Sequence, residues 1–380
     1  MINKSCITKI CKDFDLPFTA NENNFANILG IYTNSVPAES EELKNVQRAN
    51  DIFKMMRELD LPLKEYGFGT DILFKLVSDF AYFIRCSITG VYDDNRRSLY
   101  NIFNNKDINA EYPLEKINVS TGDVYNINNV GKSYISVDMC KAAFQALRHD
   151  SPELLEYQKD WNVYIKYMLT CFVEIVKHNP SLAMKSIPSN IDKIVDIEMV
   201  KNFISFYLIN SRQLRQVIFG NTNASRLCHI EKHIMQKYVY KTIMENYPSA
   251  VPVKFCNDEL IFEYTPELFA YIKQNLVTDI NFKVEAFLID GMKIVQNYDN
   301  NDELLSNEYD GIIIRRRIDT LNSFSFKCCP STLRYFANRF INGENEIIAS
   351  KVNPAFITVD VNGFTSRLIG KFTHVMFNKV

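Results

Sequence analysis

The clearest hydrophobic pattern in the chain is a pair of short apolar runs between Val251 and Tyr264, in the sequence VPVKFCNDELIFEY. Turn-type residues flank the two runs, a pattern that predicts a β-hairpin with Asp258 and Glu259 at its tip. Apolar positions spaced three and four residues apart predict helices on either side, in SRLCHIEKHIMQKYVYKTIMENY and in TPELFAYIKQNL. A further strand is predicted in INFKVEAFLIDG. The pattern thus places two acidic residues at a hairpin tip between two helices.

A second predicted strand meets an acidic residue far upstream, in YISVDMCKAAFQALR. The apolar strand pattern begins at Tyr134 and reaches Asp138, after which the spacing becomes helical. A strand that passes into a helix presents its last side chain at the carboxyl end of the strand, where functional sites often lie. Asp138 as the N-cap of the following helix is the alternative interpretation. Two acids on strands that a long helical insertion separates are what a two-metal phosphoryl-transfer site requires.

The first 120 residues are predicted to be mainly helical. ESEELKNVQRANDIFKMMREL has a helical pattern, and DILFKLVSDFAYFIRC is either a helix or a buried strand. No motif distinguishes a helical support from a template-binding extension or a domain that docks a protein partner. Residues 91–118 are polar and predict a boundary or a long surface loop, in which Arg96 and Arg97 fit a solvated face better than a phosphate contact.

Basic residues precede an aromatic residue at the end of a predicted helical region. Arg212 and Arg215 stand three residues apart, about one turn before Phe219 and Gly220. Such side chains can bind a triphosphate while the ring stacks on a base. The alternative is an amphipathic helix that ends at Gly220 as its C-cap, and the pattern taken alone favours this alternative.

Two histidines further along could share one helix face. His229 and His233 have the i, i+4 spacing that can hold zinc, with Cys228 beside them. The sequence HIEKH differs from the HExxH of zinc peptidases, and no third ligand is close in the sequence. A structural role is therefore favoured.

Beyond residue 300 the pattern indicates strands. Asp-Gly or Asn-Gly pairs at 310–311, 342–343 and 362–363 each follow or separate short apolar runs and predict hairpin turns. The run GIIIRRRI predicts a strand with Arg315 and Arg317 on one face and Arg316 on the other. These arginines suit an anionic ligand such as nucleic acid, or a charged edge strand that is protected from pairing, and the edge interpretation is favoured.

Composition narrows these interpretations only in part. The length of 380 residues predicts two or three domains. The net charge of -2 means that any surface for nucleic acid would be a local basic patch. Nine cysteines without a CxxC pair indicate reduced thiols in the cytoplasm. The N-terminal residues lack a long apolar core, so no signal peptide is expected, and no run of about 18 apolar residues predicts a membrane-spanning helix. We expect a soluble, cytoplasmic protein without a membrane partner, located in the host cytoplasm or the virion if it is viral.

The motifs together resemble the palm domain of family A DNA polymerases, the bacterial polymerase I type. CNDELIFEY with the helix and strand that follow is similar to motif C, with Asn257 where the family has histidine. YISVDMCKAAFQALR is similar to motif A, with Asp138 as its metal-binding aspartate. LRQVIFGN is similar to the core of motif B, where Arg215 takes the place of the phosphate-binding lysine and Phe219 that of the aromatic residue. The motifs occur in the order A, B, C.

The resemblance covers residues 121–295 and departs from the family in three respects. The segment between motifs B and C is short, which implies reduced fingers. Ala143 stands five residues after Asp138, where the family has the glutamate that helps to exclude ribonucleotides. No 3′-5′ exonuclease motif is visible in the N-terminal third. The Ala143 position implies weak sugar discrimination.

The resemblance implies an α+β fold with a palm-like antiparallel sheet in residues 121–299, between a helical region 1–120 and a β-rich extension 300–380. It implies a template-directed nucleotidyltransferase that uses Mg²⁺ or Mn²⁺, a nucleic-acid template and primer, and nucleoside triphosphates. The metal ligands would be the carboxylates of Asp138 and Asp258 and the carbonyl of Met139, with Glu259 as an outer or weaker ligand. Basic side chains of motif B, Arg215 and Arg212, would neutralise the triphosphate, and Phe219 would pack against the incoming base.

Three alternatives remain open at the level of sequence. The first is a non-catalytic palm-like protein that binds nucleic acid or supports an assembly, which the replaced histidine and the small fingers favour. The second is a structural or viral interaction protein whose Asn-Asp-Glu tip is only a polar turn. The third is a ligase-like nucleotidyltransferase suggested by EYDGIIIRR, which lacks a convincing KxDG nucleophile.

Overall fold

The computed structural model describes residues 2–16, 20–23, 25–26, 29–30, 41–120, 123–276, 278–298, 309–320, 323–327, 346–348, 357–359, 365–367 and 374–379. The chain forms two compact units that are interleaved in the sequence. The first unit contains residues 1–51, 121–135 and 285–380, and the second contains residues 52–120 and 136–284. The sequence predicts three consecutive ranges, 1–120, 121–299 and 300–380, whereas each compact unit combines residues from more than one of these ranges. The three ranges stay a prediction.

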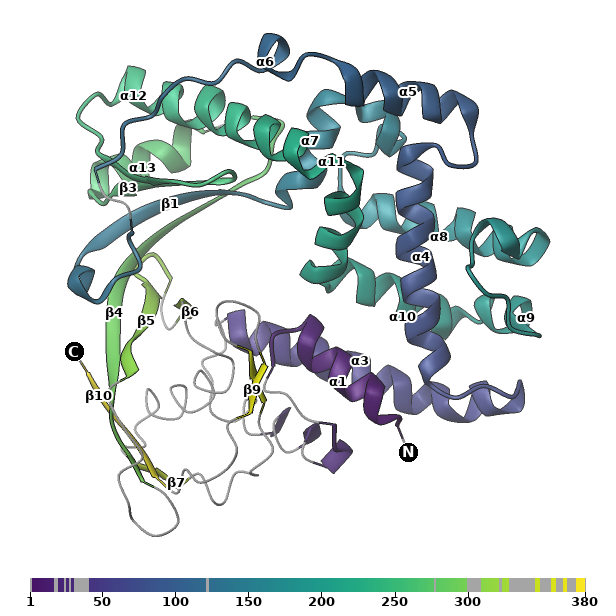
Figure 1. The fold of residues 1–380 in the computed structure, drawn as a ribbon. Helices are drawn as coiled ribbons and strands as arrows, with labels where there is room; N and C mark the ends of the chain where they lie inside the picture. Colours follow the sequence, from purple (N-terminus) through teal and green to yellow (C-terminus); the bar gives the residue numbers. More distant parts are fainter. Residues whose placement is uncertain are drawn as a thin grey trace. The chain divides into compact units, whose positions relative to one another are not determined.

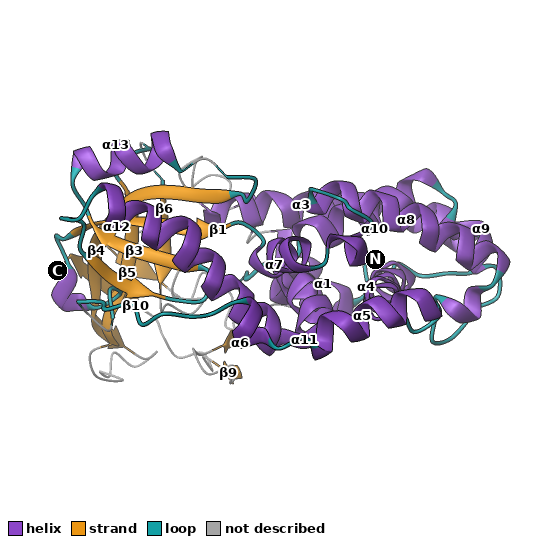
Figure 2. Ribbon diagram, turned by 90° about the horizontal axis from the view of Figure 1, so that it is seen from above, coloured by secondary structure: helices purple, strands orange, loops and turns teal. Residues whose placement is uncertain are grey.

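Helices and antiparallel strands both build the structure, which confirms the α+β class (Figures 1 and 2). The helices are α1 (Lys4–Asp13), α3 (Glu41–Glu65), α4 (Asp71–Thr89), α5 (Asp94–Asn105), α6 (Ile108–Glu111), α7 (Ala142–Asp150), α8 (Trp161–His178), α9 (Ile191–Val195), α10 (Glu198–Asn210), α11 (Arg212–Ile234), α12 (Thr242–Asn246) and α13 (Pro266–Asn275). Short 3-10 turns are η1 (Ile127–Asn129), η2 (Pro152–Leu155) and η3 (Pro180–Leu182), and η4 (Met235–Lys241) is a π-helix. In the parts of the chain that the structure describes, no helix combines the length and the apolar character needed to span a membrane.

The strands β1 and β4 each run through both units. The strands are β1 (Ser133–Met139), β2 (Pro252–Phe255), β3 (Glu259–Glu263), β4 (Phe282–Tyr298), β5 (Tyr309–Arg317), β6 (Phe324–Lys327), β7 (Glu346–Ile348), β8 (Ile357–Val359), β9 (Thr365–Arg367) and β10 (His374–Lys379). They pair in the order β2-β3-β1-β4-β10-β7, with β5 between β4 and β6, and β8 pairs with β9.

Four of these strands follow a βαββαβ order along the chain. The helices from α7 to α12 separate β1 from β2, the hairpin β2–β3 is antiparallel, and α13 separates β3 from β4. β1 and β4 are antiparallel because Ile289 bonds to Gly131 and Lys132 at one end of β1, while Asn281 bonds to Cys140 beyond the other end. With the pairing order β2-β3-β1-β4 this is the ferredoxin-like arrangement. The predicted hairpin, the strand that carries Asp138, the helix α13 and the strand β4 are confirmed.

The polar stretch between residues 91 and 118 contains helices, so the expectation of a long loop was wrong. Asp93 and Asp107 accept hydrogen bonds from the first free backbone N–H groups of α5 and α6, and thereby cap these helices. Phe103 is the only buried residue of α5. A short helix that is mostly polar and buries a single residue is easily mistaken for a surface loop in a sequence.

Helix α11 is kinked at Asn223, and Gly220 lies inside its first half, so the interpretation of Gly220 as a C-cap was wrong. The backbone of Asn223 has φ 152° and ψ 76°. Its side-chain oxygen accepts a hydrogen bond from the N–H of Arg226 at 3.0 Å, and its amide donates to Asn104 at 2.6 Å. The asparagine thus caps the second half of the helix and ties it to α5.

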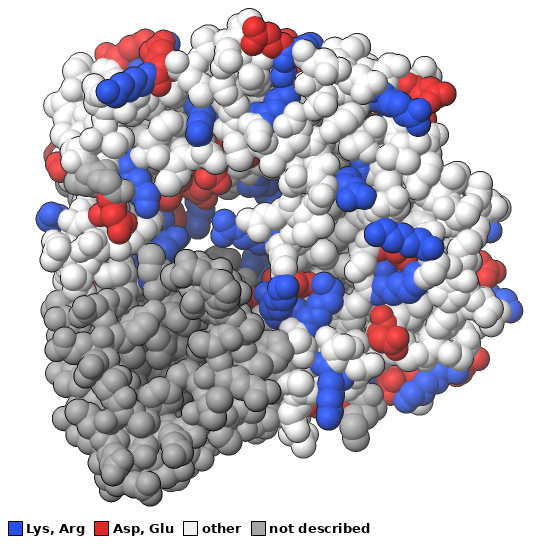
Figure 3. Space-filling model, viewed as in Figure 1, with Lys and Arg blue, Asp and Glu red and all other residues white. Residues whose placement is uncertain are grey.

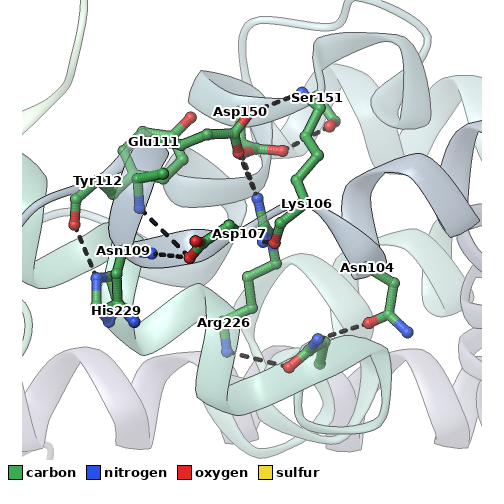
Figure 4. A network of polar contacts seen from close by, with 12 residues as sticks. Asn104, Lys106, Asp107, Asn109, Glu111, Tyr112, Asp150, Ser151, Arg226 and His229 are labelled. Carbon is green, nitrogen blue, oxygen red and sulfur yellow. Dashed lines mark hydrogen bonds and ion pairs between the residues drawn. The ribbon is translucent and has the colours of Figure 1, made fainter.

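Arg226, three residues beyond the kink, fastens α11 to two other segments (Figure 4). Its guanidinium donates to Asp150 at 3.3 Å, to Glu111 at 2.8 Å and to the carbonyl of Lys106 at 2.8 Å. The side chains of Arg226 and Asp150 are 4% and 1% exposed. The pair is therefore a buried salt bridge, and Asp150 also accepts a hydrogen bond from Ser151.

In the first unit, two expectations about the β-rich region were wrong. Asp310 and Gly311 lie within β5 and not in a turn. β5 is hydrogen bonded to β4 on one side and to β6 on the other, so it is not an edge strand. The Asn-Gly pairs at 342–343 and 362–363 lie outside the described residues.

Candidate active site

The pairing of β1 with β3 brings the segments that carry the three predicted acids next to each other in the second unit. The N–H of Met139 donates to the carbonyl of Asp258 at 2.8 Å, and the hydroxyl of Ser136 donates to the carboxylate of Glu259 at 2.6 Å. Residues two apart in a strand share a face, so Asp138 is on the face of Ser136, where the carboxylate of Glu259 lies. The structure therefore places Asp138 and Met139 beside the hairpin tip.

Asp138 is not the N-cap of the following helix, which removes the structural alternative for this residue. Asp138 belongs to β1, and α7 begins only at Ala142. The residue at the N-cap position is Lys141, whose backbone is left-handed with φ 56° and whose side chain makes no capping hydrogen bond.

The carboxyl group of Asp258 is half-buried among other charges. Burial raises its pKa, and the negative charge of Glu259 raises it further. A hydrogen bond from its own backbone N–H to the carboxylate and the positive charge of Arg212 act in the opposite direction. A carboxyl group that is hard to ionise beside a second carboxylate is an arrangement that bound cations stabilise.

Glu231 on α11 is a fourth acid of this site that the sequence analysis missed. Its side chain is buried, with the residue 6% exposed. Burial and the negative charge of Asp258 raise the pKa of Glu231 from 4.5 to about 7, while a hydrogen bond with Cys228 lowers it. The signal in the sequence is an acid on the apolar face of the helix, four residues after Leu227 and one after Ile230, both of which are buried.

Glu231→Gln is expected to change how stability depends on pH. The folded protein keeps the Glu231 proton up to about pH 7, whereas the unfolded chain releases it near pH 4.5. The contribution of this group to the free energy of unfolding is therefore fully present below pH 4.5. It is lost as the pH rises through 7, by an amount on the order of 3 kcal/mol. The variant lacks this loss, so it should match wild type at pH 4.5 and exceed it at pH 8 in urea denaturation.

The control for this experiment is Glu245→Gln, an exposed position on α12. This variant should follow the wild-type pH dependence. A Glu231→Gln protein whose stability falls between pH 4.5 and 8 as steeply as that of wild type would show that Glu231 is not the group that titrates.

Basic residues act on the charges of the site. Arg212 is exposed and acts on the charge of Asp258. Arg215 is half-buried, and its guanidinium donates to the carbonyl of Ile209 at 3.5 Å. Burial lowers the pKa of Lys141, and the charge of Arg215 contributes to this shift. Lys141 is thus a second residue of the site that the motifs did not indicate.

Phe219 is not positioned as the resemblance implies. Its ring is buried and lies 5.7 Å from the ring of Trp161 and 6.4 Å from that of Phe144, measured between centroids. The ring is therefore part of the hydrophobic core and offers no exposed face to a base. Ala143 is half-buried near the start of α7, and the structure does not test its expected role in sugar discrimination.

The two histidines of α11 serve as hydrogen-bonding groups. Nε2 of His229 lies 2.8 Å from the carbonyl of Tyr112, and Nδ1 of His233 lies 2.9 Å from the carbonyl of Pro113. Within the described residues, no three His, Cys, Asp or Glu side chains stand together as a group that could hold a metal ion.

The arginines of β5 belong to the first unit and are engaged there. Arg315 is buried and donates to Glu285 at 2.9 Å and to the hydroxyl of Tyr125 at 3.0 Å. Arg317 pairs with Glu285 at 2.9 Å and with Asp319 at 2.7 Å. The predicted common face of Arg315 and Arg317 is confirmed by their shared partner, but both guanidinium groups already hold carboxylates and are not presented to an anionic ligand.

Basic and acidic side chains are interspersed over the described surface on the face that Figure 3 shows. This mixture fits the net charge of -2.

Comparison of the chain with protein-family models, with curated proteins and with solved structures gave no match.

Proposed function

We propose that the second unit is a template-directed nucleotidyltransferase. The observation that carries this proposal is the pairing of β1, which contains Asp138, with β3, which begins at Glu259 directly after Asp258, in a βαββαβ sheet. The acids come from segments about 120 residues apart in the sequence, and a basic residue, Arg212, acts on one of them. Carboxylates beside basic side chains are the groups that phosphoryl transfer from a nucleoside triphosphate requires.

The acids fit Mg²⁺ or Mn²⁺ in their chemistry. Carboxylate and carbonyl oxygens are the ligands that these hard cations prefer. Burial, and then repulsion between the carboxylates, raises the pKa of Asp258 and of Glu231, and a bound cation offsets both effects. Asp138, Asp258 and the carbonyl of Met139 would hold the metal, with Glu259 as a weaker or outer ligand. When bound, two such ions activate a 3′-hydroxyl and stabilise the leaving pyrophosphate.

The basic residues of the chain would bind the substrate. Arg212 and Arg215 neutralise the triphosphate, and Lys141 adds a third positive charge beside Arg215. Nucleic-acid template and primer and nucleoside triphosphates are the partners in this proposal, and the helical N-terminal region remains available for a protein partner. The buried Phe219 takes no part in binding the base.

A second candidate function is a palm-like protein that binds nucleic acid without catalysis. The absence of a preformed trio of metal ligands among the described side chains favours it, as does the buried ring of Phe219. In this case Asp138 and Asp258 would be dispensable for binding to nucleic acid.

Primer extension on DNA and RNA templates, with dNTPs or NTPs and with Mg²⁺ or Mn²⁺, tests the proposal. We expect extension by the wild-type protein that EDTA and Asp138→Ala abolish. Use of NTPs alongside dNTPs is expected because Ala143 offers no carboxylate against the 2′-hydroxyl. Template binding without extension, equal in wild type and Asp138→Ala, would favour the non-catalytic function instead.

A further inference from the structure

Three large apolar side chains are exposed at the beginning of α8 and in the loop before it. Tyr157 is 69% exposed, Val163 is 52% exposed and Tyr167 is 42% exposed. Val163 and Tyr167 are four residues apart on α8 and therefore neighbours on its outer face. Arg96 pairs with Glu156, the residue before Tyr157, and its positive charge also acts on the hydroxyl of Tyr167. We call Tyr157, Val163 and Tyr167 the α8 platform.

The backbone at Tyr157 gives no structural reason for a tyrosine. Glu156 and Tyr157 both have left-handed backbones, with φ 51° and 58°. This conformation costs a residue with a Cβ atom on the order of 1–2 kcal/mol, and glycine avoids the cost. The mostly exposed ring recovers little of that cost through packing. Strained residues that the fold does not explain are characteristic of binding sites.

Two lysines that form no ion pair in the described part of the chain lie within the segment of the α8 platform. Lys159 and Lys166 are exposed, and neither forms an ion pair with any residue in the described part of the chain. Glu153, at the start of this loop, is an acid that also forms no ion pair with a described residue. Exposed rings between lysines are the chemistry that binds the bases and the phosphates of a single strand.

The other acids of this region are already engaged. Glu156 pairs with Arg96. Asp160 caps α8 and lies 3.7 Å from the amino group of Lys141. Lys141 also donates to Asn162 of α8 at 3.1 Å. Because Lys141 follows Asp138 by three residues, the α8 platform begins beside the candidate active site in the same unit.

We propose that the α8 platform binds single-stranded nucleic acid through stacking of bases on Tyr157 and Tyr167, with Lys159 and Lys166 on the phosphates. The strand would be the template, an identification that rests on the proposed function, whereas binding itself does not. DNA and RNA share the stacking chemistry, so both are ligands for the test.

Fluorescence anisotropy with labelled oligo(dT), oligo(U) and a matched duplex measures this binding in the full-length protein. Tyr157→Gly and Tyr167→Ala are each expected to weaken single-strand binding by about 5- to 100-fold. Tyr157→Gly keeps the fold because glycine adopts the left-handed backbone readily. Tyr66→Ala, at another exposed tyrosine, should bind like wild type. Lys159→Ala with Lys166→Ala should reduce the dependence of the affinity on salt.

The outcomes separate this inference from the proposed function. Oligonucleotide binding that is equal in wild type, Tyr157→Gly and Tyr167→Ala would overturn the inference even if primer extension occurs. A wild-type protein that binds no single strand would also overturn it and leave a protein partner for the exposed rings. Binding that needs the α8 platform, in a protein without extension activity, would support the inference and refute the enzyme.

Discussion

Asp258→Asn is expected to reduce nucleotide addition by about 10³-fold or more while the free energy of unfolding stays the same or rises. The loss follows from the proposed metal site, because a cation that stabilises the charge of the transition state contributes several kcal/mol and each 1.36 kcal/mol is a factor of about ten. Because asparagine has nearly the shape of aspartate, the reduced nucleotide addition would result from the missing negative charge and not from a change in packing.

The stability of the same variant should move in the other direction. Burial and the charge of Glu259 raise the pKa of Asp258, and Asp258 in turn raises that of Glu231. Both effects mean that the ionised Asp258 is unfavourable in the folded protein without a cation. Removing this charge relieves the repulsion, a trade between stability and activity that is common at functional sites.

Single-turnover primer extension and urea denaturation at pH 8 measure the two effects. Glu263→Gln is the matched control, because Glu263 is an exposed carboxylate at the far end of β3, the strand that follows Asp258. This variant should leave both quantities near their wild-type values. Undiminished nucleotide addition by Asp258→Asn would contradict the proposed role. Lower stability would instead indicate that Asp258 is a structural residue of the hairpin tip.

The central hairpin and its acids could be predicted from the sequence because their signals are local. Two apolar runs around Asp258 and Glu259 define the hairpin, and the change from strand to helix spacing after Asp138 defines the end of β1. That the two segments lie side by side required the structure, since the residues between them form the six α-helices α7 to α12. The resemblance to motifs A and C provided only an expectation of this pairing.

The remaining errors have physical causes in tertiary packing. Glycine frequently ends helices, but helix α11 continues through Gly220 and breaks at Asn223. The side chain of Asn223 accepts a hydrogen bond that replaces a lost backbone hydrogen bond. Phe219 has an aromatic ring that could stack on a base, but in the structure this ring packs against Trp161. Glu231 was overlooked because an acid on an apolar helix face becomes meaningful only when the neighbouring carboxylate is known.

Arg226→Met is expected to destabilise the protein by about 3–5 kcal/mol, the largest effect on stability among the variants considered. The substitution leaves the carboxylate of Asp150 buried without its cation, although Ser151 still donates to it. It also removes the hydrogen bonds to Glu111 and to the carbonyl of Lys106. Urea denaturation at neutral pH measures the loss.

The double variant Arg226→Met with Asp150→Asn should recover part of the loss, because it removes the stranded charge. Lys64→Met, which breaks the more exposed pair with Asp60, should cost at most about 1 kcal/mol. A small effect of Arg226→Met would mean that water reaches Asp150 when the arginine is absent. Since Arg226 fixes the helix that carries both Arg212 and Glu231, a well-folded variant should still show a shifted pH dependence at Glu231. That measurement would connect the buried salt bridge to the geometry of the acidic site.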